Sequence, residues 1–188
     1  MEFIEFETKY EVQGDLLHPF KELIEEEIGY DKFLYVQGTD VFFTKENEEG
    51  FFARYRRADH SNEAQFTLKK KHTENSSIKR TETNWDVSGT SFTEVKVGAE
   101  LMGFEYNSSI WKGCHIYNRE DATLVFYSVR DESRKIAHFI EIEVKEGVGY
   151  SEEESWEIIK KYEKLLAPLG IIAQKRKQKS LFEMYRRK

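Results

Sequence analysis

The chain has 188 residues, about the size of one domain, and we expect a single domain over residues 1–188. Its 29 Lys and Arg against 35 Asp and Glu give a net charge of -6, which disfavours binding of double-stranded nucleic acid through a basic surface. One cysteine, Cys114, excludes an intramolecular disulfide and a zinc site built from cysteines.

Alternation of apolar and charged residues begins at the N-terminus. In residues 2–12, Phe6 and Tyr10 share one side of the predicted strand, whereas Glu7 and Lys9 share the other. The same alternation and turn signals predict further strands over residues 33–44, 50–58, 64–71, 77–87, 110–118, 122–130, 137–146 and 173–184.

Three segments are predicted to be helical. The first covers residues 15–28 and ends at Gly29, and the second covers residues 91–102. The third begins at Ser151, where a capping box precedes apolar residues at helical spacing, and ends near Pro168. About nine strands with three helices indicate a mainly antiparallel α+β fold that is closed or nearly closed.

Charged residues recur two positions apart on the polar sides of these strands. The groups are Glu5, Glu7 and Lys9; Arg54 and Arg56; Lys69 and Lys71; Arg80 and Glu82; Glu141 and Glu143; and Lys175, Lys177 and Lys179. These faces either contact solvent or line the inside of a barrel. Like charges on neighbouring strands repel unless something binds between them, and this favours a lumen that holds a polyphosphate and divalent cations.

The order of these groups resembles the CYTH superfamily, the triphosphate tunnel metalloenzymes. The resemblance starts at the Glu-x-Glu-x-Lys motif of residues 5–9 and continues through residues 54–56, 67–69, 80–82, 139–143 and 179–183. It implies an eight-stranded antiparallel β-barrel with flanking helices. It also implies a tunnel, open at its ends, that binds triphosphates together with a divalent metal.

The resemblance assigns roles to the charged residues. The carboxylates expected to bind Mg²⁺ or Mn²⁺ are Glu5, Glu7, Glu82, Glu141 and Glu143. The cations expected to bind the substrate are Lys9, Arg54, Arg56, Lys69, Arg80, Lys112 and Lys179. The expected catalytic residues are Lys9, Glu5 and Glu141.

Two departures from the family pattern stand out. The predicted strand over residues 110–118 offers only Lys112 and His115, where the family has more basic residues. The next predicted strand, over residues 122–130, has no Asp near Ser128, where the family usually has one, and Asp131 lies just past it. His115 is a candidate acid or base, although a lone histidine in a strand is more often structural. The C-terminal residues 185–188 are expected to be a disordered basic end.

Three functions remain open at this stage. The first is a metal-dependent triphosphatase acting on inorganic triphosphate or on nucleoside or thiamine triphosphates. The second is a class IV-type adenylyl cyclase, and the third is a binder of triphosphates without catalysis. Hydrolysis is favoured because it needs only a positioned water, whereas cyclisation of ATP needs a defined adenosine pose. We expect a cytoplasmic protein whose partner is a small triphosphate and not a membrane; a homodimer stays open.

Overall fold

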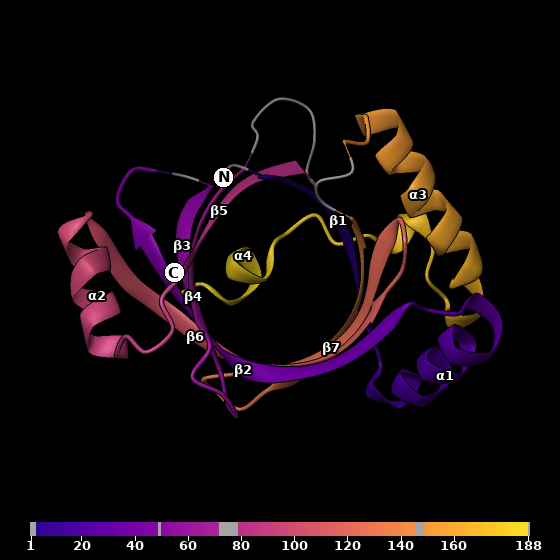
Figure 1. Cartoon of the computed structure of the whole chain (residues 1–188), viewed down its shortest axis with the longest axis horizontal. Helices are drawn as coiled ribbons and strands as arrows, with labels where there is room; N and C mark the ends of the chain where they lie inside the picture. Colours follow the sequence, from indigo (N-terminus) through magenta and orange to yellow (C-terminus); the bar gives the residue numbers. More distant parts are fainter. Residues whose placement is uncertain (1–2, 49, 72–78, 146–148, 188) are drawn as a thin grey trace.

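The computed structural model describes residues 3–48, 50–71, 79–145 and 149–187. Eight strands form a closed barrel in the order β1-β5-β4-β3-β2-β6-β7-β8, and every neighbouring pair is antiparallel (Figure 1). The barrel closes at β1, which pairs with β5 on one side and with β8 on the other. The predicted α+β fold with an eight-stranded antiparallel barrel and flanking helices is confirmed.

The strands follow the predicted alternation closely. They are β1 (Phe3–Val12), β2 (Lys32–Lys45), β3 (Phe51–Ala58), β4 (Ala64–Lys71), β5 (Lys79–Asp86), β6 (Phe104–Asn118), β7 (Ala122–Asp131) and β8 (Ile136–Val144). β6 starts earlier than predicted because Phe104–Ser109 pairs with the end of β2, between Val41 and Lys45. The alternation of Phe104 and Tyr106 with Glu105 and Asn107 is short and is followed by two serines, so pairing with β2 is what identifies this segment as part of the sheet.

Helices flank the barrel on two sides (Figure 1). The first predicted helix is a continuous run of η1 (Gly14–Leu16), α1 (Leu17–Glu22) and the π-helical turn η2 (Leu23–Ile28). The others are α2 (Phe92–Leu101), α3 (Glu152–Leu165), the short turns η3 (Ala167–Leu169) and η4 (Ala173–Lys175), and α4 (Leu181–Tyr185). Within the described ranges, no helix combines the length and apolarity that crossing a bilayer requires.

The main apolar core lies outside the barrel wall, not inside it. Phe6, Tyr10 and Phe126 point outward and pack against residues of the first helix and α3 such as Phe20 and Ile159. A second cluster joins the opposite side of the barrel to α2. Because neighbouring residues of a strand point to opposite faces, this arrangement turns the charged sides of the strands toward the lumen.

The strand predicted for residues 173–184 is wrong. After η4 the chain runs beside β1, where the Lys177 N–H donates to the Lys9 carbonyl at 2.8 Å, and it then forms α4. Ser180 and Glu183 form a capping box that starts this helix. Because β1 already pairs with β8, residues 173–184 are not needed to close the barrel. The local capping box therefore decides that residues 181–185 form a helix.

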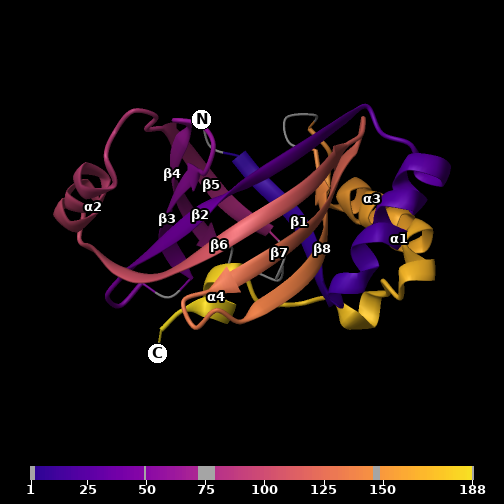
Figure 2. The same ribbon diagram turned by 90° about the horizontal axis from the view of Figure 1, so that it is seen from below.

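α4 lies across one end of the barrel (Figures 1 and 2). Its Phe182 ring stacks on Phe52 at 4.6 Å between centroids and contacts Phe42 at 5.7 Å, within an apolar cluster that also holds Val129 and Phe139. The expectation of a tunnel open at both ends is therefore corrected at this end.

The expected disorder of the C-terminal end is also wrong for residues 185–187. Tyr185 is the last residue of α4. The Arg187 N–H donates to the Asn107 side chain at 3.0 Å, and its guanidinium pairs with Glu132. Lys188 lies outside the described residues.

Candidate functional site

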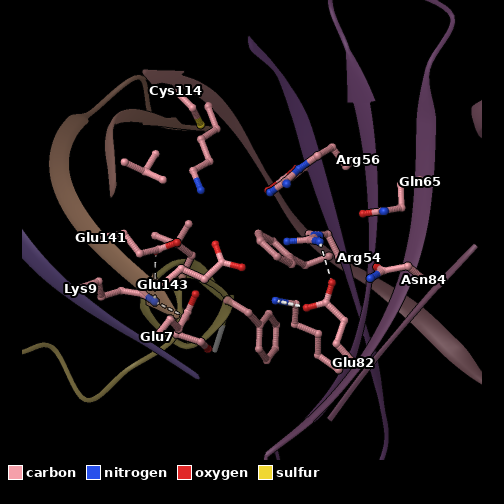
Figure 3. A pocket seen from close by; sticks show the side chains of 18 of the residues that line it. Glu7, Lys9, Arg54, Arg56, Gln65, Glu82, Asn84, Cys114, Glu141 and Glu143 are labelled. Atoms are coloured by element: carbon pink, nitrogen blue, oxygen red, sulfur yellow. Dashed lines mark hydrogen bonds and ion pairs between the residues drawn. The ribbon is translucent and has the colours of Figure 1, made fainter. Parts of the chain in front are cut away.

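A polar cavity of about 280 Å³ lies inside the barrel. Five cations and five carboxylates are among its lining residues: Lys9, Arg54, Arg56, Lys69 and Lys112, with Glu7, Asp40, Glu82, Glu141 and Glu143. Figure 3 labels seven of them, all but Lys69, Lys112 and Asp40. Leu181 and Phe182 of α4 contribute an apolar part of the lining. The formal charges of the named groups cancel, so the cavity combines both signs in one small space.

One wall of the cavity gathers carboxylates from β1 and β8. Cross-strand pairing places Glu7 beside Glu143 and Lys9 beside Glu141. The Lys9 ammonium lies 2.5 Å from Glu7 Oε1 and 3.4 Å from Glu141 Oε2, and Lys9 is only 3% exposed. The buried Tyr127 hydroxyl donates to Glu141 Oε2 at 3.0 Å. Lys9 and Tyr127 thus both contact the same oxygen of the Glu141 carboxylate.

The opposite wall carries cations from β3 and β4 together with Glu82 of β5. Lys69 Nζ lies 2.5 Å from Glu82 Oε2, and Arg54 Nη2 lies 3.6 Å from Glu82 Oε1 and donates to Thr67 Oγ1 at 3.3 Å. Burial alone would raise the pKa of Glu82, but the charges of Lys69 and Arg54 outweigh it and lower that pKa. Glu82 therefore belongs to the cationic wall, across the cavity from Glu7, Glu141 and Glu143 (Figure 3).

Asp40 was not singled out from the sequence, although it forms the closest ion pair of the cavity with an arginine. Arg56 Nε donates to Asp40 Oδ1 at 2.7 Å, and Arg56 Nη2 donates to Oδ2 at 2.8 Å. Burial disfavours the charged carboxylate, yet Arg56 holds the pKa of Asp40 well below its usual range. A lone carboxylate just before Val41-Phe42-Phe43 is the signal that could have identified it, because a charge in an apolar strand needs a partner.

β6 contributes Lys112 and Cys114 to the cavity but not His115. Lys112 Nζ lies 3.8 Å from the centroid of the Tyr127 ring, a cation–π contact. Burial raises the pKa of the Cys114 thiol, which disfavours the reactive thiolate. The His115 ring lies on the outer face of the barrel, 4.8 Å from the Tyr35 ring. His115 is therefore outside the lumen that an acid or base would need to reach.

The structure brings most of the predicted site residues together. Those that line the cavity are Glu7, Lys9, Arg54, Arg56, Lys69, Glu82, Lys112, Glu141 and Glu143. Lys179 is exposed and is not among the lining residues. Glu5 and Arg80 are cross-strand partners in β1 and β5, and their side chains lie outside the described part of the structure.

Where the family usually has an Asp near the end of this strand, β7 has Tyr127 and Ser128. Ser128 points away from the lumen and its hydroxyl lies 2.9 Å from His138 Nδ1, while its inward neighbour is Tyr127. Asp131 accepts hydrogen bonds from the Ser133 hydroxyl and the Lys135 N–H in the β7–β8 turn. It therefore does not substitute for the absent carboxylate.

The carboxylates do not form a ready-made metal cluster. Among the residues whose side chains are described, no group of three or more His, Cys, Asp or Glu is placed to hold an ion. The Lys9 ammonium, at 2.5 Å from Glu7 and 3.4 Å from Glu141, instead bridges these two carboxylates.

No protein-family model and no curated protein sequence matches the chain. Solved structures do match its fold. A conserved hypothetical protein from Pyrococcus furiosus has a TM-score of 0.75 and 20% identity, over 95% of this chain and 98% of that chain. A putative adenylate cyclase from Bacillus halodurans has a TM-score of 0.66 and 19% identity, over 98% of both chains.

A third match is a putative adenylyl cyclase from Hippeastrum, whose description adds a dominant triphosphatase activity. Its TM-score is 0.68 at 15% identity, over 97% of this chain and 94% of that chain. At such identities the similarity shows a shared fold. These matches support the closed antiparallel barrel fold that the sequence motifs implied.

Proposed function

We propose that this chain is a divalent-metal-dependent triphosphate hydrolase that acts inside the barrel. Its substrates are inorganic triphosphate or nucleoside or thiamine triphosphates. The observation that carries the proposal is the division of one cavity of about 280 Å³ into a cationic wall and a carboxylate wall. A chain of phosphates fits the first wall, and a metal ion bound to those phosphates fits the second.

The cationic wall supports binding of phosphate oxygens. Arg54 Nε is buried and has no hydrogen-bond partner among the described residues. A buried donor without an acceptor costs about 1–3 kcal/mol, and a phosphate oxygen would remove that cost. Arg56, Lys69 and Lys112 line the same cavity and add positive charge beside it. Phosphoryl transfer depends mainly on such positioning and charge stabilisation.

The carboxylate wall supports a divalent cation. Carboxylate oxygens are the donors that Mg²⁺ and Mn²⁺ take, and Glu7, Glu141 and Glu143 are the described residues that would hold the ion. Their side chains would have to rearrange around it, because in the described structure they form no cluster and Lys9 bridges Glu7 and Glu141. Glu5 precedes Glu7 by two residues in β1 and stays in the proposed set from the sequence alone, because its side chain lies outside the described part of the structure. When bound, the metal would neutralise phosphate charge and lower the pKa of a bound water. Because the five cations and five carboxylates already cancel, a triphosphate needs this added positive charge.

Glu82 and Lys9 each lie between groups of opposite charge, and we propose a separate role for each. Glu82 was expected to bind metal, but its contacts with Lys69 and Arg54 support a role in orienting those two cations. Lys9 stays a catalytic candidate, because its ammonium lies in the cavity between the two carboxylates of Glu7 and Glu141.

In the reaction, water adds to the terminal phosphorus and the bridging P–O bond breaks. Orthophosphate and the shortened phosphate chain leave.

The names of the structural neighbours support this class of substrate. The Bacillus halodurans protein is described as a putative adenylate cyclase, and the Hippeastrum protein is described with a dominant triphosphatase activity. Both reactions start from a triphosphate. They differ in whether water or a ribose hydroxyl attacks, and the products separate them.

The decisive experiment is a product assay with inorganic triphosphate, ATP and thiamine triphosphate. Each substrate is supplied with Mg²⁺, with Mn²⁺ or with EDTA, and the products are separated by chromatography. We expect metal-dependent orthophosphate release from inorganic triphosphate, with ATP a poorer substrate. Cyclic AMP and pyrophosphate from ATP would assign a cyclase instead. Binding without any product would assign a binder.

A matched pair of variants ties the activity to the cavity. Glu141→Ala removes a carboxylate of the proposed metal site and is expected to abolish turnover. Glu153→Ala removes an exposed carboxylate in the first turn of α3 and is expected to leave turnover unchanged. Equal activity of the two variants would contradict the assignment of the carboxylate wall.

A further inference from the structure

Asp40 and Arg56 form a pair that crosses directly from β2 to β3 at the cavity wall. The two residues are opposite each other in the antiparallel register. Both carboxylate oxygens accept from the guanidinium, at 2.7 Å from Nε and 2.8 Å from Nη2. Asp40 is 2% exposed, whereas the Arg56 side chain is 36% exposed and lines the cavity. One end of the pair is thus fixed in the wall and the other end reaches the lumen.

This geometry separates Asp40 from the other carboxylates of the cavity. Two parallel N–H···O bonds fix both the position and the plane of a guanidinium group, which a single contact cannot do. Asp40 uses two of the five N–H donors of Arg56, and the other three remain for further acceptors. With both of its oxygens engaged by one arginine, Asp40 orients a cation and is not a candidate metal ligand.

The neighbouring Arg54 shows the contrast. It lies two residues away on the same face of β3 and lines the same cavity. Its Nη2 is 3.6 Å from Glu82 and 3.3 Å from the Thr67 hydroxyl, and neither contact is bidentate. The two arginines of the Arg-x-Arg pair therefore differ, because only Arg56 has a partner that fixes its plane.

From these contacts we infer that Asp40 is a positioning residue, which fixes the Arg56 guanidinium for one phosphate group of the substrate. The inference rests on the proposed triphosphate hydrolase. A carboxylate in an anion-binding cavity repels the substrate, so its benefit must lie in orientation and not in affinity. Asp40 should consequently raise turnover while it weakens binding.

Asp40→Asn is the variant that separates these two effects. The amide keeps the shape of the side chain but removes the charge and one of the two acceptors. We expect kcat for inorganic triphosphate to fall about 10- to 100-fold, because displacement of the Arg56 guanidinium from its position weakens its stabilisation of the transition state by about that factor. We expect KM to stay the same or fall, because a repulsive charge has left the cavity.

A double-mutant cycle with Arg56→Gln tests the inference. If Asp40 acts through Arg56, adding Asp40→Asn to Arg56→Gln changes kcat no further, and the two effects are strongly non-additive. If Asp40 has a purely structural role, its substitution lowers kcat by the same factor in both backgrounds, and the inference is overturned. A wild-type chain without orthophosphate release overturns the proposed function as well. Normal wild-type turnover with additive effects overturns only the role of Asp40.

Glu163 supplies a matched control outside the cavity. It is 8% exposed and also accepts two hydrogen bonds from one arginine, from Arg176 Nε at 2.5 Å and Arg176 Nη2 at 2.7 Å. Glu163→Gln should lower the melting temperature without changing kcat or KM. If Asp40→Asn does not fold, Arg56→Lys keeps the positive charge but cannot form the bidentate pair. It should show the same loss of kcat, and an unchanged kcat would overturn the inference.

Discussion

The two faces of the barrel wall are built from the same strands but do different work. On β1, Tyr10 points outward and is 1% exposed beneath α3, while its neighbour Lys9 points inward and is 3% exposed among carboxylates. Burial is almost equal, yet the Tyr10 ring packs in the apolar core and only its hydroxyl donates to Glu163, whereas the Lys9 ammonium needs charged partners. The outer face therefore supports the fold, whereas the inner face gathers the charged side chains on which the proposed function depends.

The largest expected effect breaks the outer face. Phe126 is 1% exposed and packs against Phe20 with 5.8 Å between ring centroids. Phe126→Ala leaves a cavity between β7 and the first helix and should lower the free energy of unfolding by about 3–5 kcal/mol. Urea denaturation followed by circular dichroism measures this. A loss below about 1 kcal/mol would contradict the assignment of the main core to the outer face.

The second prediction removes a cation from the inner face. Arg54→Gln should lower kcat/KM for inorganic triphosphate about 100- to 1000-fold, as expected for loss of a group that stabilises developing charge. The melting temperature should change little, because loss of the long Nη2 contacts with Glu82 and Thr67 is offset by removal of the buried Nε, which has no partner within the described structure. Arg57→Gln is the matched control, since Arg57 is exposed on the outer side of the same strand. Similar losses in both variants would remove the distinction between the faces.

A third prediction sharpens the comparison through ligand binding. Mg²⁺ or Mn²⁺ together with inorganic triphosphate should stabilise the fold more than either component alone. At a ligand concentration about 100 times Kd the gain is about 2.7 kcal/mol. Differential scanning fluorimetry at millimolar concentrations gives the shift in melting temperature. The absence of any shift with both components present would contradict a triphosphate site inside the barrel.

The smallest expected effect concerns acid and the Asp40–Arg56 pair. Arg56 lowers the pKa of Asp40 below the unfolded value of 3.8, so the ionised carboxylate stabilises the native state above that pH. This stabilisation is lost as pH falls from about 4 toward the lower folded pKa. Asp40→Asn should cost about 1–2 kcal/mol at pH 7, and the difference from wild type should shrink at pH 3. Urea midpoints at both pH values measure it, and a constant difference would contradict the ionised pair.

Much of the fold follows from local patterns in the sequence. The alternation of Phe6 and Tyr10 with Glu7 and Lys9 predicts a strand with two different faces, and the capping box at Ser151 predicts the start of α3. These signals depend only on neighbours a few residues apart. The same kind of signal, Ser180 with Glu183, marks the start of α4. The lysines at alternate positions before it led instead to the prediction of a strand over residues 173–184.

Other features required the closed barrel. Closure by β1 and β8 decides that the charged faces lie inside, and the register of β4 with β5 places Lys69 opposite Glu82 on the cationic wall. The register of β2 with β3 likewise brings Asp40 to Arg56, across 16 residues of chain. Sequence alone determined which residues share the face of a strand. Which charges meet across the lumen was decided by strand register and closure, because these contacts join residues that no local pattern connects.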